Sequence, residues 1–432
     1  MKLQDILNKT NLPKVSDIVI IGGGVIGCSI AMHLAKMGSR SITLLEKNAI
    51  SSGATSRSGA MIREFYQTDF LIEMAKESRK FFEKSDINFI KNGRIYLFSK
   101  ENNESVNNNA KLNKSLGVNI EVIDKDQIEK LIPEVNTNDI SLGLFEPEAG
   151  YVDSVETTYE FAQNGIDNGV QIFTNTRAES IELNKNGVQS INTNNGKIKT
   201  KIIINASGAW ANYINKSVNE NLPIFALRVQ QVILKANLAV KPMNYCLMDY
   251  SKGTYLRPDY GNTYIAGEEL GYEENDIVSP DYYNQSSDHD VISGYKSRIV
   301  SRLPSFDNSI IKSGHAAIYD MTPDANPILG ASPKIKGLFY AVGFSGHGFK
   351  LSPSIGIRTE LIRFFFNKLA IIINAVEVLP VPVAILNMPF FTLRNLSIYI
   401  FLWSQHFSGK TGHSLSLGGG SSTGGVPPSG GT

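Results

Sequence analysis

Cysteine is almost absent from this sequence: only Cys28 and Cys246 occur among 432 residues. A disulfide framework of the kind that holds small secreted domains together is therefore excluded, and a reducing compartment is favoured. The six histidines are scattered without ligand spacing, so there is no metal signature. Residues 1–16 lack the apolar core of a signal peptide. We expect a cytoplasmic protein.

An excess of one charge is also missing. The 42 basic and 41 acidic residues leave a net charge of +1, and no basic stripe stands out. The sequence therefore gives no reason to expect a nucleic-acid partner. A chain of this length predicts two or three domains with sizeable cores.

The strongest pattern is a glycine-rich turn between an apolar run and a helical pattern. Residues 18–21 are all apolar and precede Gly22, Gly24 and Gly27 in G-x-G-x-x-G order. A second apolar run ends at Glu46, about 20 residues beyond the last glycine, where a carboxylate can bond the ribose hydroxyls. The glycines allow a tight turn, close approach of a pyrophosphate and close helix packing. This pattern predicts a βαβ unit that binds a dinucleotide, rather than one that binds none.

Further along the chain the pattern alternates between helix and strand. We expect a helix over 69–84, a strand over 94–99 and a solvated surface over 100–117. The apolar runs 170–173 and 201–205 predict buried parallel strands.

The second half begins with a different pattern. Alternating runs near 224–235, 244–249 and 253–267 predict an antiparallel sheet, inserted between pieces of the first domain. Residues 337–343 return to the buried-strand pattern, and a helix is expected from about 352 to 366.

Residues 51–63 are small and rich in hydroxyl groups until Met61. Such a run suits a loop laid along a cofactor, with backbone N–H groups and hydroxyls as donors. An ordinary flexible loop is the alternative.

Several of these segments match, in order, a known family. Between residues 17 and 366 the chain resembles the FAD-dependent amine and amino-acid oxidoreductases, which include sarcosine oxidase, dimethylglycine dehydrogenase, glycine oxidase and D-amino-acid dehydrogenase. The last motif in the order is closest to the sarcosine and pipecolate oxidase branch. The matching segments are the glycine turn with Glu46, the loop ending in Arg63, Gly150-Tyr-Val-Asp153, Asn205-Ala-Ser-Gly-Ala-Trp210, Tyr255-Leu-Arg-Pro258, Thr322-Pro-Asp-Ala-Asn-Pro-Ile-Leu-Gly330 and Gly343-Phe-Ser-Gly-His-Gly-Phe-Lys350.

The resemblance implies an α/β fold in two domains. A doubly wound, Rossmann-type FAD domain would comprise 15–75, 140–215 and 315–366. An inserted substrate domain with a mixed or antiparallel sheet would comprise 76–139 and 216–314 and cover the flavin.

The resemblance also implies which residues hold FAD. Monomeric sarcosine oxidases attach FAD through a cysteine, but Ala317 stands at that position here, so we expect non-covalent FAD. The implied cofactor-binding residues are Gly22, Gly24, Val25, Ile26, Gly27, Glu46, Lys47, Thr55, Ser56, Arg57, Ser58, Ala60, Met61, Ala178, Ala206, Gly208, Trp210, Gly343, Gly346, Gly348 and Lys350.

Four residues match the family's catalytic positions. Arg63 and Lys350 fall where the sarcosine branch clamps a substrate carboxylate, although a surface ion pair and a solvated lysine are the plain alternatives. Tyr319 matches a tyrosine of that branch, where glycine and D-amino-acid oxidases carry an arginine. His347 is expected at the flavin edge or simply at a helix start.

The reaction implied is hydride transfer to flavin N5 from a C–H beside nitrogen. The expected substrate is a small secondary, tertiary or cyclic amino acid of the sarcosine, dimethylglycine or proline type. Ile265 replaces the lysine with which the oxidases activate oxygen, so we expect a dehydrogenase or a slow oxidase, with oxygen, a quinone or an electron-transfer protein as acceptor. Two other functions stay open: oxidation of a 2-hydroxy acid with His347 as base, and an electron-transfer subunit with an idle site.

Beyond residue 366 the family pattern stops. Residues 367–416 include the strongly apolar segment 369–403, which is interrupted by prolines and by the charges Glu377 and Arg394. No stretch of about 18 charge-free apolar residues is present. The segment is either a membrane-surface or partner contact, or an aberrant addition. Residues 417–432 are expected to be disordered by composition.

Overall fold

The computed structural model describes residues 11–39, 41–237, 243–268 and 276–359. All of them belong to one compact unit, Met1–Val381. The predictions for 367–416 and 417–432 lie outside the described residues. Within the described part, no helix is long and apolar enough to cross a membrane.

The glycine turn belongs to a six-stranded sheet. Five neighbouring strands run parallel, and the sixth, β19, pairs antiparallel at one edge. Its four central strands are buried along their whole length, which explains their nearly unbroken apolar sequences. This sheet confirms the α/β, Rossmann-type part of the predicted fold. In spatial order the strands are β19 (Ile328–Ala331), β20 (Leu338–Val342), β12 (Ile202–Asn205), β1 (Ile18–Ile21), β2 (Ile42–Leu45) and β8 (Gln171–Phe173).

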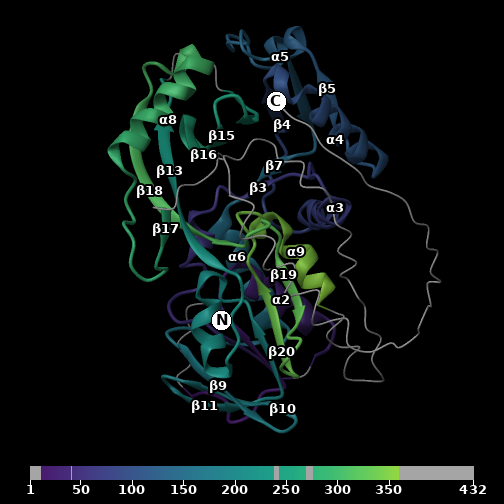
Figure 1. The fold of residues 1–432 in the computed structure, drawn as a ribbon, viewed down its shortest axis with the longest axis vertical. Coiled ribbons are helices and arrows are strands. Elements are labelled where there is room, and N and C mark those ends of the chain that lie inside the picture. The colour runs from purple at the N-terminus through teal and green to yellow at the C-terminus, as the bar shows by residue number, and fades with distance from the viewer. Residues whose placement is uncertain (1–10, 40, 238–242, 269–275, 360–432) are drawn as a thin grey trace, which may run out of the picture. The chain divides into compact units, whose positions relative to one another are not determined.

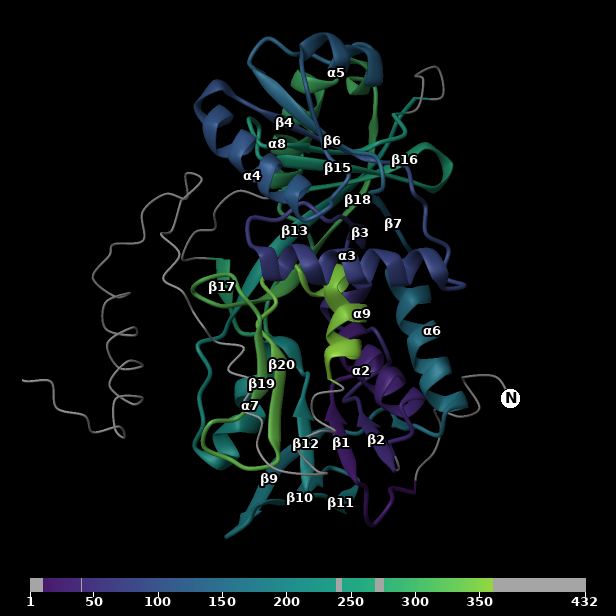
Figure 2. The ribbon, with the colours of Figure 1, turned by 90° about the vertical axis from the view of Figure 1, so that its right-hand side faces the viewer.

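Helices cover one face of this sheet, and a small sheet covers the other. Figure 2 shows α2 (Val25–Lys36) beside α9 (Gly348–Arg358) on the helical face. These two helices approach closely because Gly356 has no side chain: a Cβ there would lie 2.3 Å from Nδ1 of His33. On the opposite face, β9 (Ala178–Asn184) and β10 (Gly187–Thr193) pack on β1 and β12.

The second sheet has nine strands and is mixed, as predicted: β14 pairs parallel with β4 and antiparallel with β15. Figure 1 shows α8 (His289–Arg302) beside its strands β13, β15 and β16. The strands in order are β17 (Ile277–Val278), β13 (Phe225–Lys235), β16 (Thr263–Glu268), β15 (Thr254–Asp259), β14 (Cys246–Asp249), β4 (Arg94–Phe98), β6 (Leu142–Glu146) and β5 (Glu121–Ile123), with β18 (Ile310–Met321) paired to β13.

The remaining elements lie outside these two sheets. Helix α3 (Asp69–Lys84) spans the predicted range. The others are β3 (Met61–Ile62), α4 (Asn103–Ser115), α5 (Lys125–Leu131), β7 (Gly150–Tyr151), α6 (Ser154–Asp167), β11 (Gly196–Lys199) and α7 (Ala211–Asn215).

Three expectations from the sequence need correction. The supposed solvated surface 100–117 contains helix α4, which buries Val106 and Ala110, one helical turn apart, among asparagines of weak helix propensity. Strand β6 lies within 140–215 yet pairs in the second sheet. Helix α9 begins at Gly348, four residues before the predicted start, and its predicted end lies outside the described residues.

Candidate active site

The glycine turn is built from backbone contacts that leave no room for side chains. Gly22 has φ +111°, and a Cβ on it would lie 2.4 Å from the carbonyl oxygen of Ala206. A Cβ on Gly27 would lie 1.9 Å from the carbonyl oxygen of Gly22. Two of the predicted turn glycines are therefore required by geometry.

The turn places the start of helix α2 beside one carboxylate. Gly24 is the N-cap of α2, and no side chain caps it. The N–H of Val25 donates to Oγ1 of Thr55 at 3.2 Å. Glu46 closes the turn: Oε2 accepts from the N–H of Gly23 at 2.7 Å. This cradle, with no Cβ in the way and an acid at the end of β2, fits the phosphates and ribose of a dinucleotide.

Two more loops begin beside the cradle, where the neighbouring parallel strands β12 and β20 end. The turn after β12 begins at Ala206, whose N–H donates to the carbonyl of Ile21 at 2.9 Å. The turn after β20 is anchored by Asp320, whose Oδ2 accepts from the N–H of Gly343 at 2.7 Å. Burial raises the pKa of Asp320 to about 6, although these main-chain donors oppose the shift. Ligands of open α/β sheets bind at this edge of the sheet.

The hydroxyl-rich loop lies against these turns. It contains a short 3-10 helix (Ala54–Arg57) and then β3, whose Met61 pairs with Tyr151 of β7. Ser51 of this loop is buried and Ser58 is half-buried, whereas Ser52 and Ser56 are exposed. Ala60 is buried in the central core. The predicted residues on the cradle, the loop and the two turns are Gly22, Gly24, Val25, Ile26, Gly27, Glu46, Thr55, Ser56, Ser58, Ala60, Met61, Ala206, Gly208, Gly343, Gly346 and Gly348.

One predicted cofactor residue, Ala178, has a buried side chain and follows Thr176, whose N–H donates to the carbonyl of Glu46 at 2.8 Å. Ala178 begins β9, is 7% exposed and packs with Val19 and Leu45 in the core between the six-stranded sheet and the small sheet. An alanine in a core needs no ligand to explain it.

A segment that the sequence did not single out, the strap (279–285), contacts three predicted cofactor residues. Asp281 accepts from Nε1 of Trp210 at 2.7 Å and from Nζ of Lys47 at 3.2 Å. Nζ of Lys47 also lies 3.7 Å from the Trp210 ring centroid. Arg57 donates to the hydroxyl of Tyr283, farther along the strap, at 2.8 Å. The strap thus joins the second sheet to the edge of the cradle.

The predicted catalytic residues gather at the start of α9. The guanidinium of Arg63 lies 4.2 Å from the ring centroid of Tyr66, whose hydroxyl is 3.5 Å from Nδ1 of His347. Nζ of Lys350 donates to the carbonyl of Gly346 at 3.4 Å. Burial, with the charges of Lys350 and Arg63, holds the pKa of His347 well below its usual value. Both cations therefore act on one neutral imidazole.

Tyr319 stands next to this cluster. A Cβ on Gly346 would lie 2.7 Å from the Tyr319 ring, so only glycine leaves room for the ring at this position. Gly346 also has φ +81°, a conformation that favours glycine. Arg63 and Lys350 are only 6% and 9% exposed, which rules out a solvated side chain for either. The sequence missed Tyr66, which had no motif to mark it.

Behind Arg63 lies a buried carboxylate that the sequence also missed. Glu146 is fully buried, accepts from the hydroxyl of Tyr96 at 2.7 Å and accepts from the N–H of Glu64. Its pKa is raised by burial, and the nearby charge of Arg63 opposes that rise. The Glu64 side chain in turn pairs with Arg79 at 2.6 Å. Glu64 is thus paired with Arg79, and Glu146 interacts electrostatically with Arg63.

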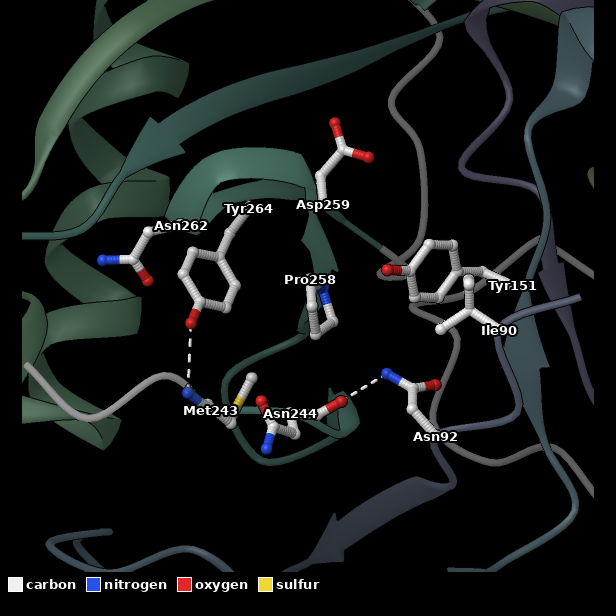
Figure 3. Close-up of a pocket in the computed structure, with 9 residues that line it drawn as sticks. All are labelled: Ile90, Asn92, Tyr151, Met243, Asn244, Pro258, Asp259, Asn262 and Tyr264. Carbon is white, nitrogen blue, oxygen red and sulfur yellow. Dashed lines mark hydrogen bonds between the residues drawn. The ribbon is translucent and has the colours of Figure 1, made fainter. Parts of the chain in front are cut away.

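A separate hollow of about 440 Å³ opens beside β15 and the segment before β14 (Figure 3). Figure 3 shows the Tyr264 hydroxyl facing the N–H of Met243, 3.0 Å away. None of the predicted site residues lines it. The lining residues are Ile90, Asn92, Tyr151, Met243, Asn244, Pro258, Asp259, Asn262 and Tyr264.

Comparison with known proteins agrees with this geometry. The family model described as "DAO: FAD dependent oxidoreductase" matches residues 17–359. The chain belongs to this FAD-dependent family. FAD is therefore the dinucleotide that the cradle fits, and the family resemblance predicted from the sequence is confirmed.

Proteins similar to this chain include two dehydrogenases and an oxidase. Sarcosine dehydrogenase of Mus musculus is 25% identical over 366 residues, which cover 80% of this chain and 39% of that protein. The chain thus spans about two fifths of the length of that relative. The L-proline dehydrogenase structure from P. horikoshii has a TM-score of 0.75 at 27% identity and covers 82% of this chain and 95% of its own. Glycine oxidase from Geobacillus kaustophilus (TM-score 0.71, 22% identity, 84% and 98% covered) shows the shared fold.

Proposed function

We propose that this protein oxidises the C–N bond of a small secondary, tertiary or cyclic amino acid, of the sarcosine, dimethylglycine or proline type. The observation that carries the proposal is the cluster at the start of α9, where Arg63 lies over the Tyr66 ring and the Tyr66 hydroxyl lies 3.5 Å from Nδ1 of His347. Lys350 contacts the carbonyl of Gly346 in the same turn. Two buried cations attract a substrate carboxylate far more strongly than exposed ones would. The names of the mouse and P. horikoshii relatives support the substrate class.

The same charges favour the reactive form of the substrate. Burial and the charges of Lys350 and Arg63, which together keep His347 uncharged, also disfavour an ammonium group beside it. The bound amine would therefore be neutral and keep the lone pair that expulsion of a hydride needs. Bound FAD supplies the hydride acceptor, and this chain's residues hold the carboxylate and the amine in place. Tyr319 adds an aromatic wall beside Gly346.

We infer that FAD is held without a covalent bond. Ala317 stands on β18, 3% exposed, where a linking cysteine would be needed, and the two cysteines are both buried. Acid precipitation should accordingly release all of the flavin into solution.

Anaerobic bleaching of the flavin absorbance tests the proposal. The protein is mixed with sarcosine, dimethylglycine, proline, glycine, D-alanine or 2-hydroxyglutarate. We expect rapid bleaching by an N-alkyl or cyclic amino acid, and readmitted air then shows whether oxygen is an acceptor. Bleaching by the hydroxy acid alone would favour His347 as a base in hydroxy-acid oxidation. No bleaching by any compound would favour an electron-transfer subunit.

A further inference from the structure

The turn that follows β20 contains three left-handed residues within four positions. Gly343 has φ +74°, Ser345 has φ +49° and Gly346 has φ +81°. The left-handed region is unfavourable for a residue with a side chain, so Ser345 needs contacts that keep the β20 turn (343–346) in this shape. Gly343 and Gly346 are both predicted cofactor residues. The shape of the β20 turn therefore sets how its main chain is presented to FAD.

The end of β18 supplies these contacts. Oδ2 of Asp320 accepts from the N–H of Gly343 at 2.7 Å, and the N–H of Phe344 also donates to this carboxylate. The main-chain carbonyl of Asp320 accepts from the N–H of Ser345 at 2.9 Å. One residue of a strand in the other sheet thus binds three successive N–H groups of the β20 turn. Adjacent N–H groups that point at one carboxylate form a site for an anion, and the charge strengthens each bond.

Asp320 also lies beside the turn that follows β12. A Cβ on Gly208 would lie 4.0 Å from Oδ2 of Asp320. Gly208, too, is a predicted cofactor residue, and the Asp320 side chain is half-buried. The carboxylate therefore stands between the two loops that begin beside the cradle.

Among the described residues, no charged side chain contributes to the pKa of Asp320. Burial raises this pKa to about 6, and main-chain N–H groups oppose the rise. The β20 turn, the turn after β12 and Ala226, the partner of Asp320 on β13, carry no charge. Asp324, His347 and Lys350 follow these elements in the chain, and none of them contributes to the shift. The carboxylate is therefore ionised at neutral pH and becomes protonated in mild acid.

We propose that Asp320 is a positioning residue for FAD, whose carboxylate keeps the β20 turn in the shape that binds the cofactor. Protonation removes the negative charge to which the N–H groups of Gly343 and Phe344 donate, so FAD is held more weakly in mild acid. This inference goes beyond the proposed function, because it concerns the cofactor and not the substrate. Either can fail while the other stands.

The dissociation constant of FAD at a series of pH values tests the proposal. The FAD-loaded protein is diluted stepwise, and the fluorescence of free flavin gives the constant between pH 7.5 and pH 5.0. If only the ionised form holds FAD, a pKa of about 6 leaves roughly one molecule in eleven competent at pH 5.0, so the constant should rise about tenfold. The profile should bend near pH 6, as for a single proton. A constant that stays within twofold over this range would overturn the proposal.

Asp320→Asn separates this carboxylate from every other titrating group, including His347. The amide has the same size, but it has one acceptor oxygen and places an NH₂ group against a main-chain donor. We expect the dissociation constant at pH 7.5 to rise at least about tenfold and to change less than twofold down to pH 5.0. A merely structural aspartate would leave the pH dependence in place. FAD binding as tight as in the original protein, or the same pH dependence, would contradict the proposal.

Asp307→Asn is the matched control. Asp307 is exposed and precedes β18 at its other end, so the same change of charge occurs away from the β20 turn. The dissociation constant and its pH dependence should equal those of the original protein. If Asp320→Asn does not fold, the pH series of the original protein still decides: a bend near pH 6 supports the proposal, and a flat profile overturns it.

Discussion

The two sheets contribute to the site in different ways. The six-stranded sheet uses main-chain groups of short, contiguous turns: Gly22, Gly27 and the N–H of Gly343. The nine-stranded sheet uses side chains, such as those of Asp320 and Tyr319 on β18, which reach the turns of the first sheet from a distant strand. A backbone cradle tolerates no added atom, whereas a side-chain network weakens by degrees. The comparison predicts abrupt losses on the first sheet and graded ones on the second.

The largest effect is expected at Gly27. In Gly27→Ala the new methyl would collide with the Gly22 carbonyl, 1.9 Å away, and move the turn. We expect purified protein without FAD and a loss of about 3 kcal/mol in the free energy of unfolding. Flavin content and urea unfolding measure both. Gly294→Ala, in open space on α8, is the control and should bind FAD normally. Full flavin content in Gly27→Ala would break the comparison.

Arg63→Ala should have the next largest effect. The substitution removes one buried cation of the proposed clamp, so the second-order rate of flavin reduction by the amino acid should fall by about 100-fold or more. Stopped-flow bleaching provides the rate. Arg228→Ala, which loses a pair with Asp288 outside the cluster, should reduce its flavin normally. An undiminished rate in Arg63→Ala would show that this arginine does not hold the substrate.

Ile265→Lys sharpens the comparison on the second sheet. Ile265 pairs with Arg257 and packs against the central core, and a cation there would stabilise negative charge developing on oxygen. We expect reoxidation of the reduced flavin by air to accelerate at least about tenfold. Ile277→Lys, on the exposed edge strand β17, should leave it unchanged. Equal rates in both variants would mean that Ile265 does not face the flavin.

The pH dependence of stability should report His347. Its pKa in the folded protein lies below the unfolded value of about 6.5, so the unfolded chain binds the proton first. Its contribution is therefore present above the unfolded pKa and is lost as the pH falls below it. His347→Gln should lose less stability between pH 7.5 and 5.5 in urea titrations, by at most about 1.4 kcal/mol per pH unit. Identical pH profiles would show that burial and the two cations do not hold His347 neutral in the folded protein.

The smallest effect is expected at the strap. Asp281→Ala removes the acceptor shared by Lys47 and Trp210 on a partly exposed surface, where such contacts contribute about 1 kcal/mol or less. FAD release, followed by flavin fluorescence on dilution, should become a few times faster. Asp290→Ala, at a fully exposed position on α8, should not change it. An unchanged release rate in Asp281→Ala would mean that the strap does not retain the cofactor.

The parts of the site that the sequence predicts and those that it does not differ in the same way as the two sheets. The sequence correctly predicts strand, turn, helix and strand over residues 18–46, because the glycine spacing, the apolar period and the closing acid all lie within one short stretch. Arg63, His347 and Lys350 were named from motifs, and the structure brings them together. Local pattern thus predicts the backbone cradle, and motifs predict three side chains of the cluster at the start of α9.

The rest depends on contacts that no local pattern encodes. Glu146 and Tyr66 meet the cluster through pairing of distant segments, and neither lies in a recognisable motif. Asp320 meets the N–H of Gly343 through the register of β18 on β13, and a shift by one residue would turn its side chain to the other face. The sequence did not predict helix α4, because its many asparagines have weak helix propensity.

The most direct test of the carboxylate clamp compares each amino acid with its carboxylate-free amine. Proline is compared with pyrrolidine, and sarcosine with dimethylamine, as anaerobic reductants of the flavin at equal concentrations of neutral amine. The account predicts that at least one amino acid bleaches the flavin 100 times faster than its amine or more, in line with the loss expected for one buried cation. Equal rates within both pairs would show that Arg63 and Lys350 do not bind a substrate carboxylate.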